Sequence, residues 1–355
     1  MPAEIGVAVV GLGGKGRSHA RNLATLPGVR LLALCDVDAD AVARARSELG
    51  EAGSAAYGAT DVERVLADPN VAAVVIATQH DSHRPLAVAS ARAKKHLLVE
   101  KPLALTREDC RAIVEAVEAS GVRAIMGFQA RYRHFVRLMK ERIPAPKVVV
   151  GEIIDPKWPD EFWAVDPIKG GGNVLSQGVH TFDLVCYLAG GEPRDVHARG
   201  GVFSHDPARA PTVDTCLATI GFDNGALASV TIGDFGPLPW LPDKCFYQVF
   251  DARDHSATMY GDRLLFASVD GSGRKVEELT EADHGDGERP DYHGTLRLVE
   301  ELVDCARENR PPRIGATVRE GERATLLSLA AFESMRTGQS ERLGGLPSPA
   351  GRGLG

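Results

Sequence analysis

Scarce and scattered cysteines are the first constraint that this sequence sets. Its six cysteines form no CxxC pair, which argues against a structural zinc site or a disulfide framework and fits a reducing compartment. We therefore expect no bound metal. No apolar run reaches the roughly 18–20 residues of a membrane-spanning helix. The first residues, MPAEIGVAVVG, lack the basic start and cleavage pattern of a secretory signal, so we expect a cytoplasmic protein.

Basic clusters and internal repeats are also missing. The chain has 41 Lys and Arg against 48 Asp and Glu, a net charge of −7, which makes nucleic acid or an anionic membrane an unlikely partner. Its 44% hydrophobic and 25% charged residues are ordinary for a globular protein. A length of 355 residues is too great for one compact core and suits two domains.

The first part of the chain alternates short apolar runs with amphipathic stretches. The runs are apolar on both faces, as buried parallel strands are, and they lie at 7–11, 29–36, 72–78, 96–100 and 122–127. Helical patterns lie between them, one beginning at Thr106 and another at a capping box of Thr60 and Glu63. Strand–helix–strand repetition predicts a doubly wound parallel sheet, an α/β domain over residues 1–127.

After residue 127 the pattern changes to partial alternation, typical of an antiparallel sheet. Strand-like segments occupy 147–154, 195–202, 215–222 and 226–233, and the pattern continues through 246–252, 257–262 and 263–269. The turn Asp223-Asn224-Gly225 predicts a hairpin. Helical patterns follow at 294–307 and 319–336. We expect an α+β domain with a large open sheet over 128–345, and a disordered tail at 346–355.

The first chemical motif is a glycine-rich turn between a strand and a helix. It reads Gly11-Leu12-Gly13-Gly14-Lys15-Gly16, a GxGxxG pattern, and Asp36 ends the next strand. Such a turn lets a pyrophosphate approach the backbone at the helix N-terminus. Asp36 can accept hydrogen bonds from the adenosine ribose and repel the 2′-phosphate of NADP. The motif therefore predicts NAD binding, although Lys15 and Arg17 leave NADP open.

Glu100-Lys101-Pro102 stands at the carboxyl end of the strand 96–100. Ligands of open α/β sheets lie beyond those strand ends, so Lys101 could point toward the cofactor. Pro102 restricts the backbone there, with a cis bond as one option. A surface lysine at a strand end is the alternative interpretation.

The third motif is the stretch GGGNVLSQGVHTFD at 170–183. If Asn173 caps a helix that ends at Gly190-Gly191, Ser176, His180 and Asp183 share one polar stripe. Asp183 could then hold one imidazole nitrogen of His180 and leave the other as a base. A half-buried structural histidine is the alternative that this helix alone allows.

Together these motifs resemble those of the Gfo/Idh/MocA family, the group of glucose–fructose oxidoreductase and inositol dehydrogenase. The pattern is GxGxxG with its acid, then EKP, then GGGxxxxxGxHxxD. Thr78 and His83 in ATQHDSH resemble the family's TPxxxH segment, and GFQARY at 127–132 resembles another family segment. The resemblance covers roughly residues 5–342.

Membership would imply a Rossmann domain, then an α/β domain whose open sheet often carries an oligomer interface, giving a homodimer or homotetramer. The usual activity is NAD(P)-dependent oxidation of a secondary alcohol on a sugar or cyclitol, or the reverse reduction. By the resemblance, Lys101 contacts both nicotinamide ribose and substrate hydroxyl, His180 accepts the proton, and Gln129 lies on the nicotinamide side. The flanking Glu100 and Pro102, with Thr78 and His83, complete the cofactor contacts that we expect.

The chemistry of the residues agrees with this assignment. A histidine, with an ordinary pKa of about 6.5, can remove a hydroxyl proton at neutral pH, and a nearby ammonium stabilises the developing alkoxide. Two departures from the family pattern stand out. Ser176 replaces a common aspartate four residues before the histidine and cannot hold a proton or a negative charge. Gln79 replaces a proline.

Substrate contacts are expected in KWPDEFWAVDPIKGGG at 157–172. Trp158 and Trp163 could stack on the apolar face of a sugar, with Ser176 as a polar contact, or they could belong to the core or an oligomer contact. Arg131 could reach a substrate or merely pair with an acid.

The sequence therefore predicts an NAD-dependent sugar or cyclitol dehydrogenase with a small polyhydroxylated substrate. The alternatives are a redox-neutral NAD-dependent lyase or glycosidase that oxidises its substrate transiently, and a non-catalytic dinucleotide-binding regulator.

Overall fold

A computed structural model describes residues 4–236, 244–280 and 294–343 of the chain. They form two compact units, each described here by itself. The first comprises the described parts of 1–132 and 293–322, and the second those of 133–292 and 323–355. The units are therefore not two continuous segments, because residues 294–322 return to the first and the chain then re-enters the second. The tail predicted at 346–355 lies outside the described residues.

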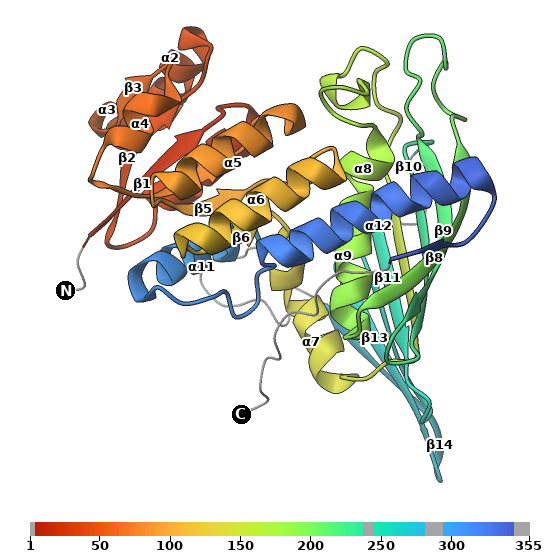
Figure 1. The fold of residues 1–355 in the computed structure, drawn as a ribbon. Coiled ribbons are helices and arrows are strands. Elements are labelled where there is room, and N and C mark those ends of the chain that lie inside the picture. The colour runs from red at the N-terminus through yellow and green to blue at the C-terminus, as the bar shows by residue number, and fades with distance from the viewer. Residues whose placement is uncertain (1–3, 237–243, 281–293, 344–355) are drawn as a thin grey trace. The chain divides into compact units, whose positions relative to one another are not determined.

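The first unit is built on a six-stranded parallel sheet in the order β3-β2-β1-β4-β5-β6 (Figure 1). Its strands are β1 (Ile5–Val10), β2 (Val29–Cys35), β3 (Tyr57–Ala59), β4 (Val71–Ile76), β5 (His96–Val99) and β6 (Ala124–Met126). The order reverses at β1 and β4, which confirms the predicted doubly wound sheet. The sequence analysis missed β3, because only one of its three residues is buried.

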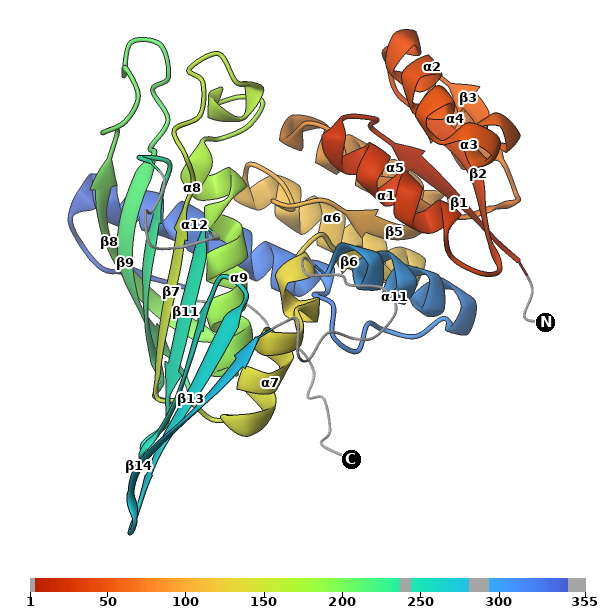
Figure 2. The ribbon, with the colours of Figure 1, turned by 180° about the vertical axis from the view of Figure 1, so that it is seen from behind.

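Helices cover both faces of this sheet (Figure 1, and from behind in Figure 2): α1 and α11 pack together on one, α5 and α6 on the other. The helices and 3-10 turns are α1 (Gly14–Ala24), α2 (Ala39–Glu48), α3 (Gly50–Ala55), α4 (Val62–Ala67), η1 (His80–Ser82), α5 (His83–Arg92), α6 (Arg107–Ser120), η2 (Gln129–Tyr132) and α11 (Thr295–Glu308). Thr106 caps α6 as predicted, its hydroxyl accepting from the Asp109 N–H at 3.1 Å. The predicted cap of α4 was wrong by one residue, because Asp61, and not Thr60, accepts from the Glu63 N–H.

Helix α11 belongs to the first unit because its apolar face joins that core. Leu298, Val299 and Leu302 are fully buried in one cluster with residues of β1, β2 and α1. The carboxylate of Glu301 also accepts a hydrogen bond from the Tyr132 hydroxyl at 2.6 Å and another from the Gly315 N–H at 2.8 Å. A buried charge with several donors ties the returning segment to the end of the Rossmann sheet.

The second unit carries a nine-stranded sheet in the order β14-β13-β12-β11-β7-β10-β9-β8-β15. Its strands are β7 (Val148–Ile154), β8 (Pro193–Gly201), β9 (Thr215–Phe222), β10 (Leu227–Gly233), β11 (Cys245–Phe250), β12 (His255–Tyr260), β13 (Arg263–Asp270), β14 (Gly273–Thr280) and β15 (Glu341–Arg342). Among the described strands of this sheet, only β7 and β10 pair in parallel, which confirms a mostly antiparallel sheet. The predicted hairpin at Asp223-Asn224-Gly225 joins β9 to β10, with Gly225 at φ +79°. Strand β14 was not predicted, because its largely exposed sequence GRKVEELT carries little apolar signal.

One face of this sheet is covered by helix, with α9 packed along β7 and β10 (Figure 1). The helices and the 3-10 turn of this part are α7 (His134–Arg142), η3 (Trp163–Val165), α8 (Asn173–Ser176), α9 (Gly178–Ala189) and α12 (Val318–Thr337), which begins in the first unit. The Ala198 N–H of β8 donates to the Ser334 hydroxyl near the end of α12 at 2.9 Å. Across the described part of the chain, no helix combines the length and apolar character needed to cross a bilayer.

The opposite face of the nine-stranded sheet presents a row of apolar side chains. Leu227, Val148 and Phe250 are cross-strand partners, and the same row continues through Ser256 and Ala267 to Val276. Leu227 is 59% exposed and Val148 39% exposed. Side chains opposite one another in register lie on the same face, so these six residues form one strip, apolar except at Ser256.

Candidate active site

The glycine-rich turn of the first unit is shaped by close backbone contacts. Gly11 has φ +88°, and its N–H donates to the Cys35 carbonyl at 2.8 Å. A Cβ on Gly16 would lie 1.8 Å from the Gly11 carbonyl oxygen, so only glycine fits there. A Cβ on Gly13 would meet no atom within 4 Å apart from its chain neighbours. The backbone there, at φ −64°, also suits any residue, so glycine is not required by the fold itself.

This open space at Gly13 fits a pyrophosphate. Gly13 precedes the first turn of α1, and no side chain caps the free N–H groups there. Such N–H groups and the helix dipole favour an anion. Lys15, half-buried in that first turn, adds a positive charge, and Gly14 adds no side chain.

Asp36 follows β2 and lies beside this turn. Its Oδ2 accepts from the Leu12 N–H at 2.7 Å, and its Oδ1 from the Asp38 N–H at 3.0 Å. The carboxylate therefore holds the glycine turn and is half-buried at the end of its strand. Its position matches the acid that binds an adenosine ribose in Rossmann domains.

Glu100, at the end of β5, is a buried carboxylate in contact with α1, the helix that follows the glycine turn. Its Oε1 lies 2.7 Å from Nε2 of His19 on α1, and its Oε2 accepts from the Lys101 N–H at 3.3 Å. Burial raises the pKa of Glu100, but the charges of Lys15 and Lys101 and the bond to His19 outweigh it, so the pKa lies well below its usual range. The carboxylate is thus ionised and links the glycine turn to the strand end that carries Lys101.

Sequence reasoning missed His19. Its side chain is fully buried on the face of α1 that also carries Gly16, Ala20 and Leu23. A polar residue on an otherwise small and apolar helix face was the available signal, because such a group needs a buried partner.

The loops after β4 and β5 are joined by His83. Its Nδ1 lies 2.8 Å from the Pro102 carbonyl and its Nε2 3.3 Å from the Thr78 carbonyl. Burial holds the pKa of His83 below its usual value, although both ring nitrogens lie near carbonyl oxygens. The Lys101–Pro102 peptide bond is cis, the option that the sequence left open. The Thr78 hydroxyl accepts from Ser82 at 2.7 Å.

Gln129 and Arg131, on η2, differ in what they offer. The Gln129 Oε1 is buried and has no hydrogen-bond partner among the described residues, so it can accept from a bound amide. Arg131 is fully buried, and its Nη1 donates to Glu320 at 2.9 Å. Of the two roles considered for Arg131, the structure shows the pairing with an acid.

Glycines 170–172 precede the helical segment of the second unit that carries Ser176 and His180. A Cβ on Gly170 would lie 2.2 Å from the Ala164 Cα, which leaves no room for another residue. Gly171 has φ +78° and Gly172 φ +85°, in the region that favours glycine. The three glycines therefore close a tight loop from η3 to α8.

The expected single helix over 173–189 is broken. Asn173 does not cap it, because Gly172 takes the N-cap position and Asn173 instead donates to Asp155 Oδ2 at 3.2 Å. Gln177, at φ −107°, separates α8 from α9, which ends at Gly190 in the left-handed region. Ser176 ends α8.

His180 and Asp183 lie one turn apart on α9 and are both buried, at 9% and 2% exposure. Ser176 is buried as well, at 4%. The polar stripe is therefore not a solvent-facing side of the helix. Buried polar groups in an apolar helix are held by specific partners or serve a site.

Three aspartates at one edge of the large sheet hold the neighbouring loops of the second unit. None of the three was predicted from the sequence. Asp155 follows β7, and its Oδ1 accepts from Lys244 at 2.9 Å. Asp214 precedes β9 and accepts from the backbone N–H groups of residues 203–205. Asp234 follows β10. Parallel β7 and β10 end at the edge where antiparallel β9 begins.

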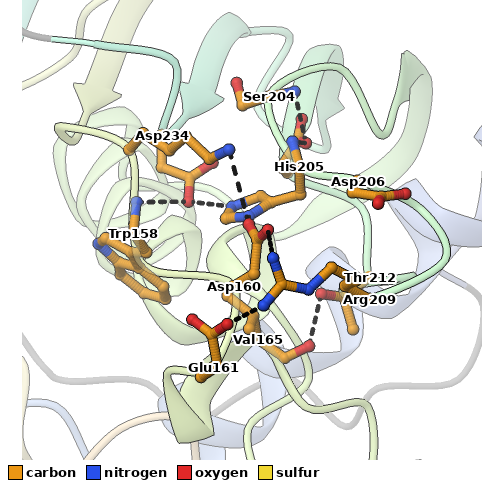
Figure 3. A network of polar contacts seen from close by, with 12 residues as sticks. Trp158, Asp160, Glu161, Val165, Ser204, His205, Asp206, Arg209, Thr212 and Asp234 are labelled. Carbon is orange, nitrogen blue, oxygen red and sulfur yellow. Dashed lines mark hydrogen bonds and ion pairs between the residues drawn. The ribbon is translucent and has the colours of Figure 1, made fainter.

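The tryptophan segment 157–172 is tied to that edge through His205 (Figure 3). The ring of His205 lies between two carboxylates, with Nδ1 2.9 Å from Asp160 Oδ1 and Nε2 2.7 Å from Asp234 Oδ2. Within the segment, Trp158 and Phe162 make an edge-to-face contact with ring centroids 5.3 Å apart. Trp158 and Trp163 are half-buried, so neither is a core residue.

Comparison with known proteins identifies the class of protein as an NAD-binding oxidoreductase. The doubly wound sheet and its glycine turn agree with this class. Residues 5–128 match the oxidoreductase family with an NAD-binding Rossmann fold, and residues 138–262 match the GFO/IDH/MocA C-terminal domain. The chain belongs to the Gfo/Idh/MocA family, as its motifs predicted.

Its relatives include inositol dehydrogenases. The chain is 29% identical over 352 residues to a myo-inositol 2-dehydrogenase of Thermotoga maritima, covering 95% of this chain and 98% of that protein. It is 32% identical over 251 residues to a scyllo-inositol 2-dehydrogenase (NAD(+)) of Bacillus subtilis, covering 67% and 69%.

Solved structures share the fold. A probable dehydrogenase from Thermotoga maritima superposes with a TM-score of 0.76 at 25% identity, covering 96% of this chain and 99% of that one. A levoglucosan dehydrogenase in complex with NADH and L-sorbose superposes with a TM-score of 0.85 at 21% identity, again covering 96% and 99%.

The second and third glycines of the GxGxxG pattern, Gly13 and Gly16, give a matched test. Gly13→Ala should keep the fold and weaken NAD binding by at least about tenfold, ~1.4 kcal/mol, because the new methyl group occupies only the open space. Gly16→Ala should lower the melting temperature, because its Cβ meets the Gly11 carbonyl. Calorimetric titration with NAD and thermal unfolding check both variants, and an unchanged NAD affinity in folded Gly13→Ala would contradict the assignment.

Proposed function

We propose that the protein is an NAD-dependent dehydrogenase that oxidises a secondary hydroxyl of a sugar, sugar derivative or inositol-like cyclitol, or catalyses the reverse reduction. The observation that carries this proposal is the position of Lys101. Its backbone is held by Glu100, which also contacts α1 behind the glycine turn. An ammonium beside a dinucleotide site suits the polarisation of a hydroxyl. The inositol dehydrogenases among the relatives support the substrate class.

The residues present fit a dinucleotide. Gly13 and the first turn of α1 would hold the pyrophosphate, Asp36 the adenosine ribose, and Gln129 the carboxamide of the nicotinamide. Thr78, His83 and Pro102 would shape the loops on either side. Bound NAD supplies the acceptor for the hydride, a step that side chains alone do not perform.

Two side chains would act on the substrate hydroxyl. Lys101 donates to the hydroxyl oxygen and stabilises negative charge there. His180 acts as the base that removes the hydroxyl proton, and Asp183 on the same helix orients the imidazole ring. Because Ser176 cannot carry a charge, the proton would leave His180 without the aspartate that many family members have.

Substrate recognition would fall to Trp158, Trp163 and Ser176. Half-buried indole rings offer a flat apolar surface for the C–H face of a sugar, and the serine hydroxyl offers a polar contact. Arg131 has no part in this proposal, because its guanidinium is fully buried against Glu320.

A purified sample screened with NAD against sugars, uronates and inositols, followed by nucleotide absorbance, tests the activity. Net NADH formation supports the dehydrogenase. Tightly held nucleotide with substrate turnover but no net NADH would instead indicate the redox-neutral lyase or glycosidase. None of the six cysteines, all of which lie in the described ranges, forms a disulfide, which agrees with the cytoplasmic location that we propose.

Loss of either reacting side chain should stop the chemistry. Lys101→Ala and His180→Ala should each lower kcat by at least about 100-fold, the usual contribution of acid–base catalysis, while the Kd for NAD stays within about threefold. Lys275→Ala and His197→Ala, in the large sheet, serve as matched controls. Near-normal turnover in both active-site variants would exclude this mechanism.

Asp36 should decide between NAD and NADP. Asp36→Asn keeps an acceptor for the Leu12 N–H but removes the charge that repels a 2′-phosphate. The ratio of NAD to NADP affinity should fall by at least about tenfold, ~1.4 kcal/mol. Fluorescence titration with both nucleotides measures it, with the exposed Asp38→Asn as control. An unchanged ratio would show that another residue sets the preference.

The apolar strip on the open face of the large sheet supports a homodimer or homotetramer. Leu227→Glu places a charge on a 59% exposed side chain at one end of that strip and should shift the protein toward monomer in sedimentation velocity. Val37→Glu, a substitution at a 92% exposed site of the first unit, is the control. Sedimentation identical to wild type in Leu227→Glu would remove this face as the interface.

A further inference from the structure

The buried cluster around His205 has no role in the chemistry proposed above. His205 is 6% exposed and Asp234 fully buried, and both lie next to the tryptophan segment (Figure 3). The described residues also place Asp214 in this cluster, with ligand atoms of all three within 4.8 Å of one another. The oxygens of Asp214 are occupied by backbone N–H groups and the Thr215 hydroxyl, so this carboxylate serves the loop and not a cation.

The geometry sets the charge of His205. Ionised carboxylates only accept hydrogen bonds, and a neutral imidazole donates from one nitrogen alone. With Asp160 and Asp234 both ionised, contacts of 2.9 Å and 2.7 Å to them place a proton on each ring nitrogen, and the raised pKa of His205 agrees with this charge. The imidazolium balances the buried charge of Asp234, whose ionic contact among the described residues is His205.

The same contacts connect the segment to the sheet. Asp160 lies in the segment, whereas Asp234 follows β10. Oδ2 of Asp234 also accepts from the Trp158 N–H at 3.4 Å, so His205 and the backbone of Trp158 share one oxygen. A second tie joins the Thr212 hydroxyl to the Val165 carbonyl at 2.8 Å.

We propose that His205, an imidazolium clamped between Asp160 and Asp234, is a positioning residue that holds Trp158 and its segment in place for the substrate. This inference rests on the proposed function, in which Trp158 contacts a polyhydroxylated substrate. His205 touches neither the reacting hydroxyl nor the cofactor in that proposal. His205 affects substrate binding only by fixing where the segment 157–172 lies.

The clamp depends on pH because His205 holds both carboxylates only while its ring is protonated. Burial lowers the pKa of His205, but the bonds to Asp160 and Asp234 outweigh it and raise the pKa above its usual value. A raised histidine pKa gives stabilisation that is complete below pH ~6.5 and is lost as pH rises through the folded-state value. The bond from His205 lowers the pKa of Asp160, and burial raises that of Asp234. Lys157, Arg209 and Glu161 are the other charged groups around Asp160.

The first experiment follows Trp158 without any substrate. Acrylamide quenching of tryptophan fluorescence is recorded from pH 5 to pH 10 in wild type and in Trp158→Phe, and the difference reports Trp158. Quenching of Trp158 should rise at alkaline pH in wild type. In His205→Gln it should be high and independent of pH. The control His255→Gln, which removes an exposed His–Asp pair, should behave as wild type.

The second experiment uses the substrate found by the screen. His205→Gln should raise KM for that substrate at least about tenfold while kcat and the Kd for NAD change less than about threefold. Asp160→Asn, which leaves the buried His205–Asp234 pair intact, should raise KM in the same direction. Asp160→Asn combined with His205→Gln should add little to the single variants, because both break one contact.

The two experiments distinguish a failure of the His205 clamp from a failure of the proposed dehydrogenase activity. If the screen finds no substrate, the quenching experiment still decides the clamp. If His205→Gln does not fold, His205→Gln with Asp234→Asn removes both buried charges, and restored folding with persistently high quenching supports positioning. Wild-type quenching and KM in folded His205→Gln would overturn the inference. A wild-type melting temperature that falls on addition of EDTA would also overturn it, since the cluster would then be a metal site.

Discussion

The buried carboxylate of Glu100 is the interaction on which the arrangement around the glycine turn of the first unit depends. It joins helix α1, through His19, to the strand end that carries Lys101. Its charge persists under burial because Lys15, Lys101 and His19 surround it. Hydrogen bonds to an ionised carboxylate are stronger than those between neutral groups, so Glu100 holds helix α1 and the end of β5 together. The glycine turn and the lysine are therefore parts of one electrostatic unit.

The second unit uses the same device at the edge of its sheet. Asp155, Asp214 and Asp234 stand where β7 and β10 end and β9 begins, and each holds a loop through hydrogen bonds to its carboxylate. The helix with His180 and the segment with Trp158 both start from this edge. A rigid sheet with charged anchors at one edge suits a site whose contacts come from loops.

Much of the first unit was predictable because its signals are local. Apolar runs identified five of the six parallel strands, and the spacing of Gly11, Gly13, Gly16 and Asp36 indicated the nucleotide turn. The reasons for these glycines differ, however, and only the structure separates them: Gly16 has no room for a Cβ, whereas Gly13 leaves space for a ligand. Short or exposed strands such as β3 and β14 carry too few apolar residues to be recognised.

By itself, the sequence determined the two sheet types, the family and the residues with suitable chemistry, because periodicity and motif spacing are properties of neighbouring residues. Tertiary structure alone decided which polar residues meet. Arg131 became a partner of Glu320, 189 positions away, and His205 became the link between Asp160 and Asp234. Ion pairs of this kind join residues that are distant along the chain, and burial selects them because an unpaired charge inside a protein is costly.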